Sequence, residues 1–491
     1  MGPVSGRKGA HVRKLGVPGR TAVVVLAAAL GTMSPAGAWA QTTDDDSGLY
    51  YAYPPPSSGS PPSDDGQPDQ AYKKNTECVQ RDLNNNLVLR DKPWGQTYLQ
   101  IEEAQRLALA KTGTIGGNKT VAVIDTGVTN HPYFKHPVIG GGDYVNPPNN
   151  GLEDCDGHGT EVAGIIAANT PADIGFKGVA PDTQIVSIRQ SSQNYGPANG
   201  GSSSQSGKGS RQQGDGAGNL TTLAKAVRRA ADRGDVSVIN MSVDNCRQST
   251  GTISPQEQAL QAAIHYAVHV KNIVVVAAAG NVSDSCKQND QPNPNKPQSI
   301  VSPPWFSDDV LSVAAVDETG GVANFSVHGP WVSVAAPGTN ITSLDPSQPA
   351  STALANQVVE GGNLQPIQGT SFAAPYVTGL VALVRAQFPG LNAQQVMHRI
   401  EATAQHPGAP GGRDNYIGHG VVNPVAALSA IVPEEEGIPA AKDEQLPSGL
   451  PPAAHRDWAP VIVALGGTGG GLLVLLITLF VMHTIRRNRH A

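Results

Sequence analysis

Three residue types that together perform nucleophilic hydrolysis occur in short motifs along this 491-residue chain. Asp125 begins Asp-Thr-Gly, His158 begins His-Gly-Thr, and Ser371 ends Gly-Thr-Ser. A histidine can take the proton of a serine hydroxyl that attacks an acyl carbon, and an aspartate can orient that histidine and stabilise its cation. Each motif alone is a weak signal, because such tripeptides also end strands and cap helices. Together they predict acyl transfer to a serine.

The segments around these motifs can position such a triad. Residues 120–124 are a mostly apolar run, typical of a buried parallel strand, and Asp125 follows at its carboxyl end, where open α/β sheets bind ligands. His158 precedes a run of small and apolar residues at 161–168 that predicts a buried helix. Ser371 opens another apolar helical segment, so we expect it at a helix N-terminus, facing a developing anion. A capping or core histidine is the alternative for His158.

A fourth candidate, Asn281, follows an apolar run at residues 273–279 that predicts another buried strand. Acyl transfer places negative charge on the former carbonyl oxygen, and a side-chain amide can donate a hydrogen bond to it. We therefore interpret Asn281 as an oxyanion donor. An asparagine that only shapes a turn is the alternative.

This chemistry requires no metal and no cofactor, and we expect none. Other histidines lack a carboxylate or cysteine cluster at ligand spacing, so we expect surface or core roles for His131, His136, His265 and His269. Structural calcium stays open, because its sites use scattered oxygen atoms that local spacing does not reveal.

Strands and helices alternate along the middle of the chain, which predicts the α/β class. The strand-like runs are residues 121–124, 184–188, 236–241, 273–277 and 310–316, with helical patterns at 220–232 and 255–271. We expect one catalytic domain at 119–432 with a mostly parallel sheet flanked by helices. Within it, residues 190–218 are rich in Gly, Ser and Gln and predict a mobile insertion, which is either a lid or docking loop or a tolerated insertion.

Both ends of the chain carry targeting signals. Residues 1–40 combine basic residues, a short apolar run and Ala-Trp-Ala, as in a cleaved signal peptide; Pro35 interrupts the run and disfavours an uncleaved anchor. Residues 461–482 are uncharged and long enough to cross a membrane, and a buried soluble helix is the alternative. The basic tail, 483–491, is expected in the cytoplasm. We therefore predict a single-pass type I protein of the cell membrane with its catalytic domain outside.

Two proline-rich segments complete the chain. The N-terminal extension, 41–118, begins with a disordered or extended part up to about residue 71 and includes a helix-like stretch at 98–111. The acidic linker, 433–460, is expected to hold the domain off the membrane. The formal net charge of −6 and the lack of a basic patch with aromatic residues give no reason to expect nucleic-acid binding.

The four cysteines fit an oxidising compartment and allow three pairings. Cys246 and Cys286 follow the two strand ends expected beside the active site. Cys78 lies in the extension, and Cys155 lies just before His158. We therefore predict disulfides Cys78–Cys155 and Cys246–Cys286. A zinc site is the alternative, but no Cys-x-x-Cys spacing supports it.

The order of Asp125, His158 and Ser371 resembles that of the subtilisin-like proteases. The resemblance implies a subtilisin-like fold, with these residues as the triad and Asn281 as the oxyanion donor. The signal peptide, cysteine-bearing extension, acidic linker and C-terminal membrane helix make the chain similar to the mycosins, membrane-anchored proteases of actinobacterial type VII secretion systems.

The mycosin resemblance implies a function and partners. It implies a membrane-anchored serine endopeptidase that cleaves a restricted set of secreted proteins, with an extension that wraps the domain and is retained. The implied partners are proteins secreted by the same system, the type VII secretion membrane complex, and the lipid bilayer through residues 461–482. The alternative is a structural component that caps or stabilises this complex independently of proteolysis.

The substrate-binding segment departs from the subtilisin-like pattern. Residues 239–242 match the substrate-binding strand, but Val-Asp-Asn-Cys at 243–246 replaces the usual Leu-Gly-Gly. Larger and charged side chains would narrow or recharge the specificity pocket, which restricts the substrates. The resemblance assigns substrate binding to Ser242, Val243, Asp244, Ala279 and Gly280.

Overall fold

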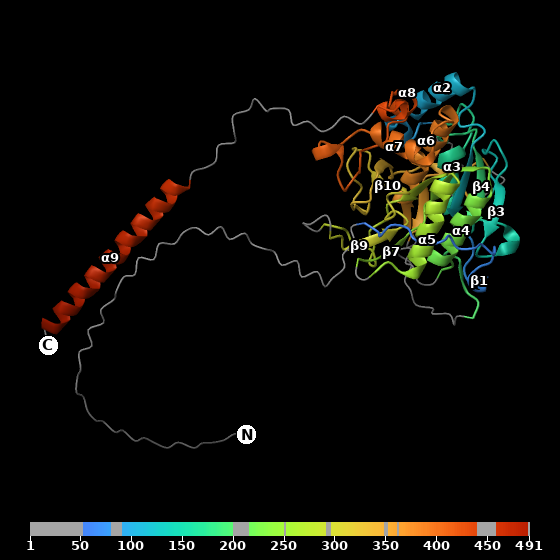
Figure 1. The fold of residues 1–491 in the computed structure, drawn as a ribbon. Coiled ribbons are helices and arrows are strands. Elements are labelled where there is room, and N and C mark those ends of the chain that lie inside the picture. The colour runs from blue at the N-terminus through green and yellow to red at the C-terminus, as the bar shows by residue number, and fades with distance from the viewer. Residues whose placement is uncertain are drawn as a thin grey trace, which may run out of the picture. The chain divides into compact units, whose positions relative to one another are not determined.

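The computed structural model describes residues 53–79, 91–199, 216–249, 252–290, 296–347, 352–360, 363–438 and 458–489. The predicted signal peptide, the centre of the predicted insertion and most of the linker lie outside these ranges. Figure 1 shows the described catalytic domain as a sheet with helices packed around it.

A seven-stranded sheet forms the centre of the domain, and all of its neighbouring strands pair in parallel. Its order is β11-β10-β8-β6-β2-β4-β3. The strands are β2 (Thr120–Asp125), β3 (Ile139–Asp143), β4 (Gln184–Arg189), β6 (Val236–Met241), β8 (Val274–Ala278), β10 (Leu311–Val316) and β11 (Val334–Pro337). The predicted subtilisin-like, mostly parallel α/β architecture is confirmed.

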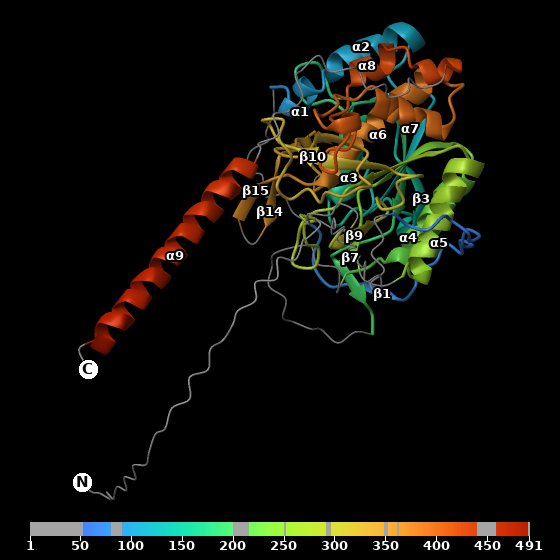
Figure 2. The same cartoon turned by 60° about the vertical axis from the view of Figure 1, so that its left-hand side comes forward.

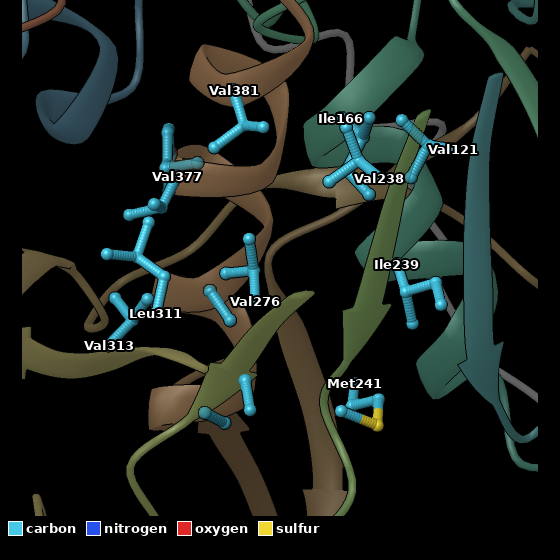
Figure 3. Close-up of a cluster of buried hydrophobic side chains, with 14 of the residues drawn as sticks. Val121, Ile166, Val238, Ile239, Met241, Val276, Leu311, Val313, Val377 and Val381 are labelled. Atoms are coloured by element: carbon cyan, nitrogen blue, oxygen red, sulfur yellow. The ribbon is translucent and has the colours of Figure 1, made fainter. Parts of the chain in front are cut away.

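Two pairs of helices pack closely together around this sheet. One pair is α3 (His158–Ala167) with α6 (Thr370–Gln387), and the other is α4 (Leu220–Asp232) with α5 (Pro255–His265). Side chains such as Val121, Val238, Val276 and Val377 fill the space between strands and helices (Figure 3). Helices cover the sheet, so its central strands are apolar along their whole length, which is why they were visible in the sequence.

The remaining helices are α1 (Trp94–Tyr98), α2 (Ile101–Thr112), α7 (Ala393–Ala402) and α8 (Pro424–Ser429), together with the short turns η1 (Pro147–Asn149) and η3 (Pro410–Gly412). Figure 2 shows α1 and α2 beside α8. Short antiparallel pairs join β12 (Ser343–Leu344) to β13 (Leu354–Ala355) and β14 (Gln357–Glu360) to β15 (Asn363–Pro366).

The edge strands β3 and β11 were not predicted. Strand β3 contains three successive glycines, which sequence patterns assign to loops. A Cβ atom at Gly141 would lie 2.6 Å from Cγ1 of Val186 on β4. The glycine therefore permits close strand pairing here, in a segment that has no apolar signal.

Residues 53–71 of the extension contain no helix or strand and are bound to the domain, whereas α1 and α2 later in the extension are helical. Strand β1 (Tyr72–Lys74) pairs antiparallel with β5 (Tyr195–Pro197). Asp64 accepts a hydrogen bond of 3.0 Å from Arg229 on α4 and one of 2.7 Å from the hydroxyl of Tyr144. Asp65 pairs with Lys225 of α4 at 2.9 Å. These contacts make the extension a strap across α4.

The predicted insertion begins as ordered structure instead of a free loop. Its first described residues include β5, whose Tyr195 is buried. The guanidinium of Arg189 lies 4.5 Å from the centre of the Tyr195 ring and forms an ion pair with Glu153 at 2.7 Å. The extension thus supplies the strand that fixes this part of the predicted loop.

The domain also extends past its predicted end at residue 432. A short helical turn, η4 (Pro433–Glu436), follows directly, and Glu435 forms an ion pair with the buried Arg399 of α7. Farther on, α9 (Ala459–Arg489) is the one helix in the described ranges that is long and apolar enough to cross a membrane. It contains the predicted span of 461–482 and continues into the basic tail.

Candidate active site

Asp125 and His158 lie in direct contact, although 33 residues separate them. Asp125 is the last residue of β2 and is fully buried. Its Oδ1 atom lies 2.7 Å from Nδ1 of His158, the first residue of α3, and accepts a 2.8 Å hydrogen bond from the Thr126 amide. The carboxylate thus fixes the imidazole with Nδ1 as the donor, which leaves Nε2 free to accept a proton.

Ser371 lies in the first turn of α6, and the residue after it contacts this histidine. The ring of the following residue, Phe372, lies 5.1 Å from the imidazole, centre to centre. The Nε2 atom of His158 is buried and has no hydrogen-bond partner among the described residues. Gly369, just before the helix, has a φ of 148°, which a residue with a Cβ atom rarely adopts. The turn therefore presents the hydroxyl and the amides of the helix N-terminus together.

Asn281 is held in one orientation by the residue before the serine. Its Oδ1 atom accepts hydrogen bonds from the amide of Thr370 at 3.0 Å and from the Thr370 hydroxyl at 3.2 Å. The same hydroxyl oxygen accepts a bond from the Gly280 amide at 3.2 Å. Because Oδ1 is occupied, the Nδ2 donor remains for an oxyanion beside Ser371.

A buried polar chain behind the serine was missed by sequence reasoning. The Ser242 hydroxyl donates to the carbonyl of Ser371 at 2.7 Å and accepts from Nδ2 of Asn240 at 3.0 Å. Oδ1 of Asn240 in turn accepts from the Thr378 hydroxyl on α6 at 2.7 Å. Ser242 is therefore a positioning residue through its side chain. Asn240, a polar residue within an apolar strand, was the signal that could have revealed this chain.

Asp154 was also missed, and it joins the aspartate and histidine segments. Its Oδ1 accepts from the Thr126 hydroxyl and the Gly157 amide, both at 2.8 Å, and its Oδ2 accepts from the Thr160 amide at 2.8 Å and hydroxyl at 2.6 Å. Burial raises the pKa of Asp154 to about 6, although the Thr160 hydrogen bonds favour the charged form. No motif marks this residue, because its role depends on joining its own segment, with Gly157 and Thr160, to Thr126 after β2.

The predicted substrate-binding residues lie on two loops that a disulfide joins. Residues after Met241 continue into β7 (Asn245–Gln248), which pairs with β9 (Ser299–Ser302). The structure pairs Cys246 with Cys286, and Cys78 with Cys155, as predicted. Cys155 lies three residues before His158, so the second bond attaches the extension beside the active-site histidine.

Asp244 carries charge into the expected specificity pocket. A Cβ atom at Gly280 would lie 3.2 Å from Oδ2 of Asp244, so this carboxyl group reaches the facing loop. Burial raises the pKa of Asp244 to about 6, an effect that positive charge on His158 opposes. Val243 packs against the core, and Ala279 is fully buried. Of the five predicted substrate-binding residues, Asp244 and Gly280 therefore face each other across the two loops.

The parallel sheet, the Asp125–His158 contact and the serine at a helix N-terminus define a serine peptidase of the subtilisin type. Residues 116–420 match the model of the subtilase family. Mycosin-1 of Mycolicibacterium smegmatis is 40% identical over 463 residues, covering 91% of this chain and 95% of that protein. Mycosin-1 of Mycobacterium tuberculosis is 43% identical over 376 residues, covering 74% of this chain and 79% of that protein.

Solved structures agree with these relatives. The crystal structure of MycP1 from the ESX-1 type VII secretion system has a TM-score of 0.68 at 40% identity, covering 78% of this chain and 97% of that one. A chain in an intact ESX-5 inner membrane complex has a TM-score of 0.64 at 37% identity, covering 87% of this chain and 97% of that one. The chain therefore belongs to the subtilase family, in its mycosin branch, and is a membrane-anchored serine endopeptidase.

Proposed function

We propose that Ser371 is the nucleophile, His158 the general base and Asp125 the residue that orients it. The observation that carries this assignment is the 2.7 Å contact between Asp125 and Nδ1 of His158, with Nε2 of the imidazole left without a partner. Nε2 takes the proton of Ser371 as its oxygen attacks the peptide carbonyl, and later gives it to the leaving amine. A water molecule activated by the same imidazole then hydrolyses the acyl-enzyme.

The oxyanion of each tetrahedral intermediate is stabilised by Nδ2 of Asn281 and by the backbone amide of Ser371. Thr370 supports this role, because its two hydrogen bonds to Oδ1 orient the carboxamide before substrate binds. Donors that are fixed in advance require no reorganisation during the reaction. The positive end of the α6 dipole adds to the same effect.

The cleavage is restricted to few substrates. Asp244 and the Cys246–Cys286 bond shape the pocket on two sides, in place of the small residues that give a wide pocket. The strap formed by residues 53–79 and the bond from Cys78 to Cys155 hold the extension on the enzyme. Proteins secreted by the same system are the proposed substrates.

The enzyme operates at the outer surface of the cell membrane as part of type VII secretion. The related chains in ESX-5 inner membrane complexes support association with such a complex. Helix α9 ends in Arg486, Arg487 and Arg489, which favour the cytoplasmic side and thus support an outside location of the domain. Two disulfides suit that oxidising side of the membrane.

The assignment of the triad is tested by covalent labelling. The full chain in detergent is treated with a fluorophosphonate and its intact mass is measured beside Ser371→Ala and His158→Ala. We expect one adduct on the unmodified enzyme and none on the Ser371 variant. The His158 variant should react far more slowly. An adduct of equal extent on folded Ser371→Ala would contradict the assignment.

A structural contribution to the secretion complex is a second function, favoured by the presence of relatives in the solved ESX-5 assemblies. Complementation of a deletion strain with Ser371→Ala separates the two functions. Restored secretion without substrate processing supports the structural contribution. Lost secretion with a normally abundant variant supports a need for catalysis.

A further inference from the structure

Three residues far from the active site bring metal-ligating atoms together: His265, His269 and Asp309. His265 is the last residue of α5, His269 lies in the π-helical turn η2 (Tyr266–Val270), and Asp309 precedes β10. Nδ1 of His265 lies 2.9 Å from Oδ2 of Asp309, and Nε2 of His269 lies 2.6 Å from Oδ1. One ligand atom from each residue lies within 4.8 Å of the others.

We propose that this cluster binds a divalent transition-metal ion, with Zn²⁺ as the representative case. Two imidazole nitrogens and one carboxylate oxygen suit zinc and its neighbours, whereas calcium and magnesium prefer oxygen ligands alone. Three protein ligands leave a further position for water. Sequence patterns predicted no metal site at His265 and His269, because Asp309 is 44 and 40 residues away from them, respectively, along the chain.

The helix geometry places the two imidazoles side by side. Residues four apart are neighbours on a helix surface, and the centres of these two rings are 4.1 Å apart. The π-helical turn has a bond from the Lys271 amide to the carbonyl of Tyr266, five residues earlier. Turns of this type are frequent at functional sites.

The burial of the three residues suits metal entry from solvent. The Asp309 side chain is 8% exposed and therefore fixed, whereas the side chains of His265 and His269 are 47% and 34% exposed. Around a tetrahedral zinc ion, ligand atoms are about 3.3 Å apart, as follows from zinc bonds of about 2.0 to 2.1 Å. The two contacts with Asp309, at 2.9 and 2.6 Å, would lengthen by roughly 0.4 and 0.7 Å to reach this spacing.

The ion would act on structure and not on catalysis. The cluster lies where η2 leads into β8 and where a loop leads into β10, at the amino ends of these strands. The active site lies at the carboxyl ends, after Asp125 and Ala278. A bound ion would attach the end of α5 to the loop before β10, where His265 and His269 already form hydrogen bonds with Asp309.

The test is zinc binding by the full chain in detergent after chelator treatment, measured by isothermal titration calorimetry and by the thermal midpoint. We expect one saturable Zn²⁺ site, a higher midpoint with Zn²⁺ and no such effect with Ca²⁺. The variant His265→Ala/His269→Ala should lose this site. Because both side chains are largely exposed, this variant should fold and keep its full rate of fluorophosphonate labelling.

A matched control is His406→Ala. His406 and His419 are also neighbours, with ring centres 6.1 Å apart, but His406 contacts the backbone carbonyl of Gly412 instead of a carboxylate. This variant should bind zinc like the unmodified chain. Absence of saturable zinc binding, or equal binding by the His265/His269 double variant, would overturn the proposal and leave the cluster as an ion-paired contact. Neither result depends on the assignment of the triad.

Discussion

Replacing Asn281 with alanine tests whether the structure has assigned the oxyanion site correctly. The substitution removes the Nδ2 donor, whose partner atom Oδ1 is held by Thr370 at 3.0 and 3.2 Å. Loss of one such donor lowers turnover by about 100- to 1000-fold, which corresponds to about 2.7 to 4 kcal/mol of transition-state stabilisation. Since the interaction forms with the developing anion, substrate affinity should change little.

The structure also predicts a smaller effect for the residue that holds the amide. Thr370→Val removes the hydroxyl that donates to Oδ1 and accepts from the Gly280 amide, while the backbone bond to Asn281 remains. Of the two hydrogen bonds lost, the one to Oδ1 of Asn281 affects the oxyanion donor; it is worth about 0.5 to 1.5 kcal/mol, so the rate should fall by about 2- to 12-fold. Thr370→Ser keeps the hydroxyl and is the matched control.

The assay is the second-order rate constant for fluorophosphonate labelling, followed by intact mass, because this reaction also places negative charge on an oxygen beside the serine. Thermal unfolding of each variant checks that the domain is intact. The expected order of rates is unmodified enzyme and Thr370→Ser, then Thr370→Val, then Asn281→Ala. A folded Asn281→Ala variant that labels within threefold of the unmodified rate would refute the assigned oxyanion donor.

Three further outcomes follow from the same structure. A double serine variant that removes the Cys78–Cys155 bond should have a free energy of unfolding that is lower by about 4 kcal/mol on the chain-entropy model. Urea denaturation measures this change. An unchanged midpoint would show that the strap is held by its other contacts. Ser242→Ala removes the hydrogen-bond partner of the Ser371 carbonyl and of Nδ2 of Asn240. We therefore expect a loss of about 1 to 3 kcal/mol in the free energy of unfolding and slower labelling of Ser371. Equal labelling rates would exclude a positioning role for Ser242. Asp244 has a pKa raised to about 6, so it is mostly protonated at pH 5 and ionised at pH 7.5. In a peptide-library assay, the preference for a basic over a neutral residue before the cleaved bond should therefore rise between these two pH values. If the same rise persists in Asp244→Asn, this carboxylate is not its cause.

The chemistry of this protein could be predicted from its sequence because each active-site motif lies next to a strongly apolar segment. Residues 120–124 could only be a buried strand, so the position of Asp125 at its carboxyl end followed from the pattern alone. The membrane helix was equally clear, since a long uncharged run followed by arginines satisfies a constraint set by bilayer thickness. The two disulfides followed from which cysteines flank the strand ends.

Tertiary structure decided the features that depend on partners distant in sequence. Asp154 has no motif. Three of its four hydrogen bonds are local, to Gly157 and Thr160, but the bond from the Thr126 hydroxyl exists only because the loop after β2 meets this segment. Strand β3 lacks an apolar signal, since its glycines permit pairing that the neighbouring strand imposes. Surface or core roles were expected for His265 and His269, because local spacing along the chain cannot reveal Asp309, which only the folded sheet brings to the end of α5. Local periodicity determines which segments become strands and helices, whereas contacts between them form only when the chain closes into one core.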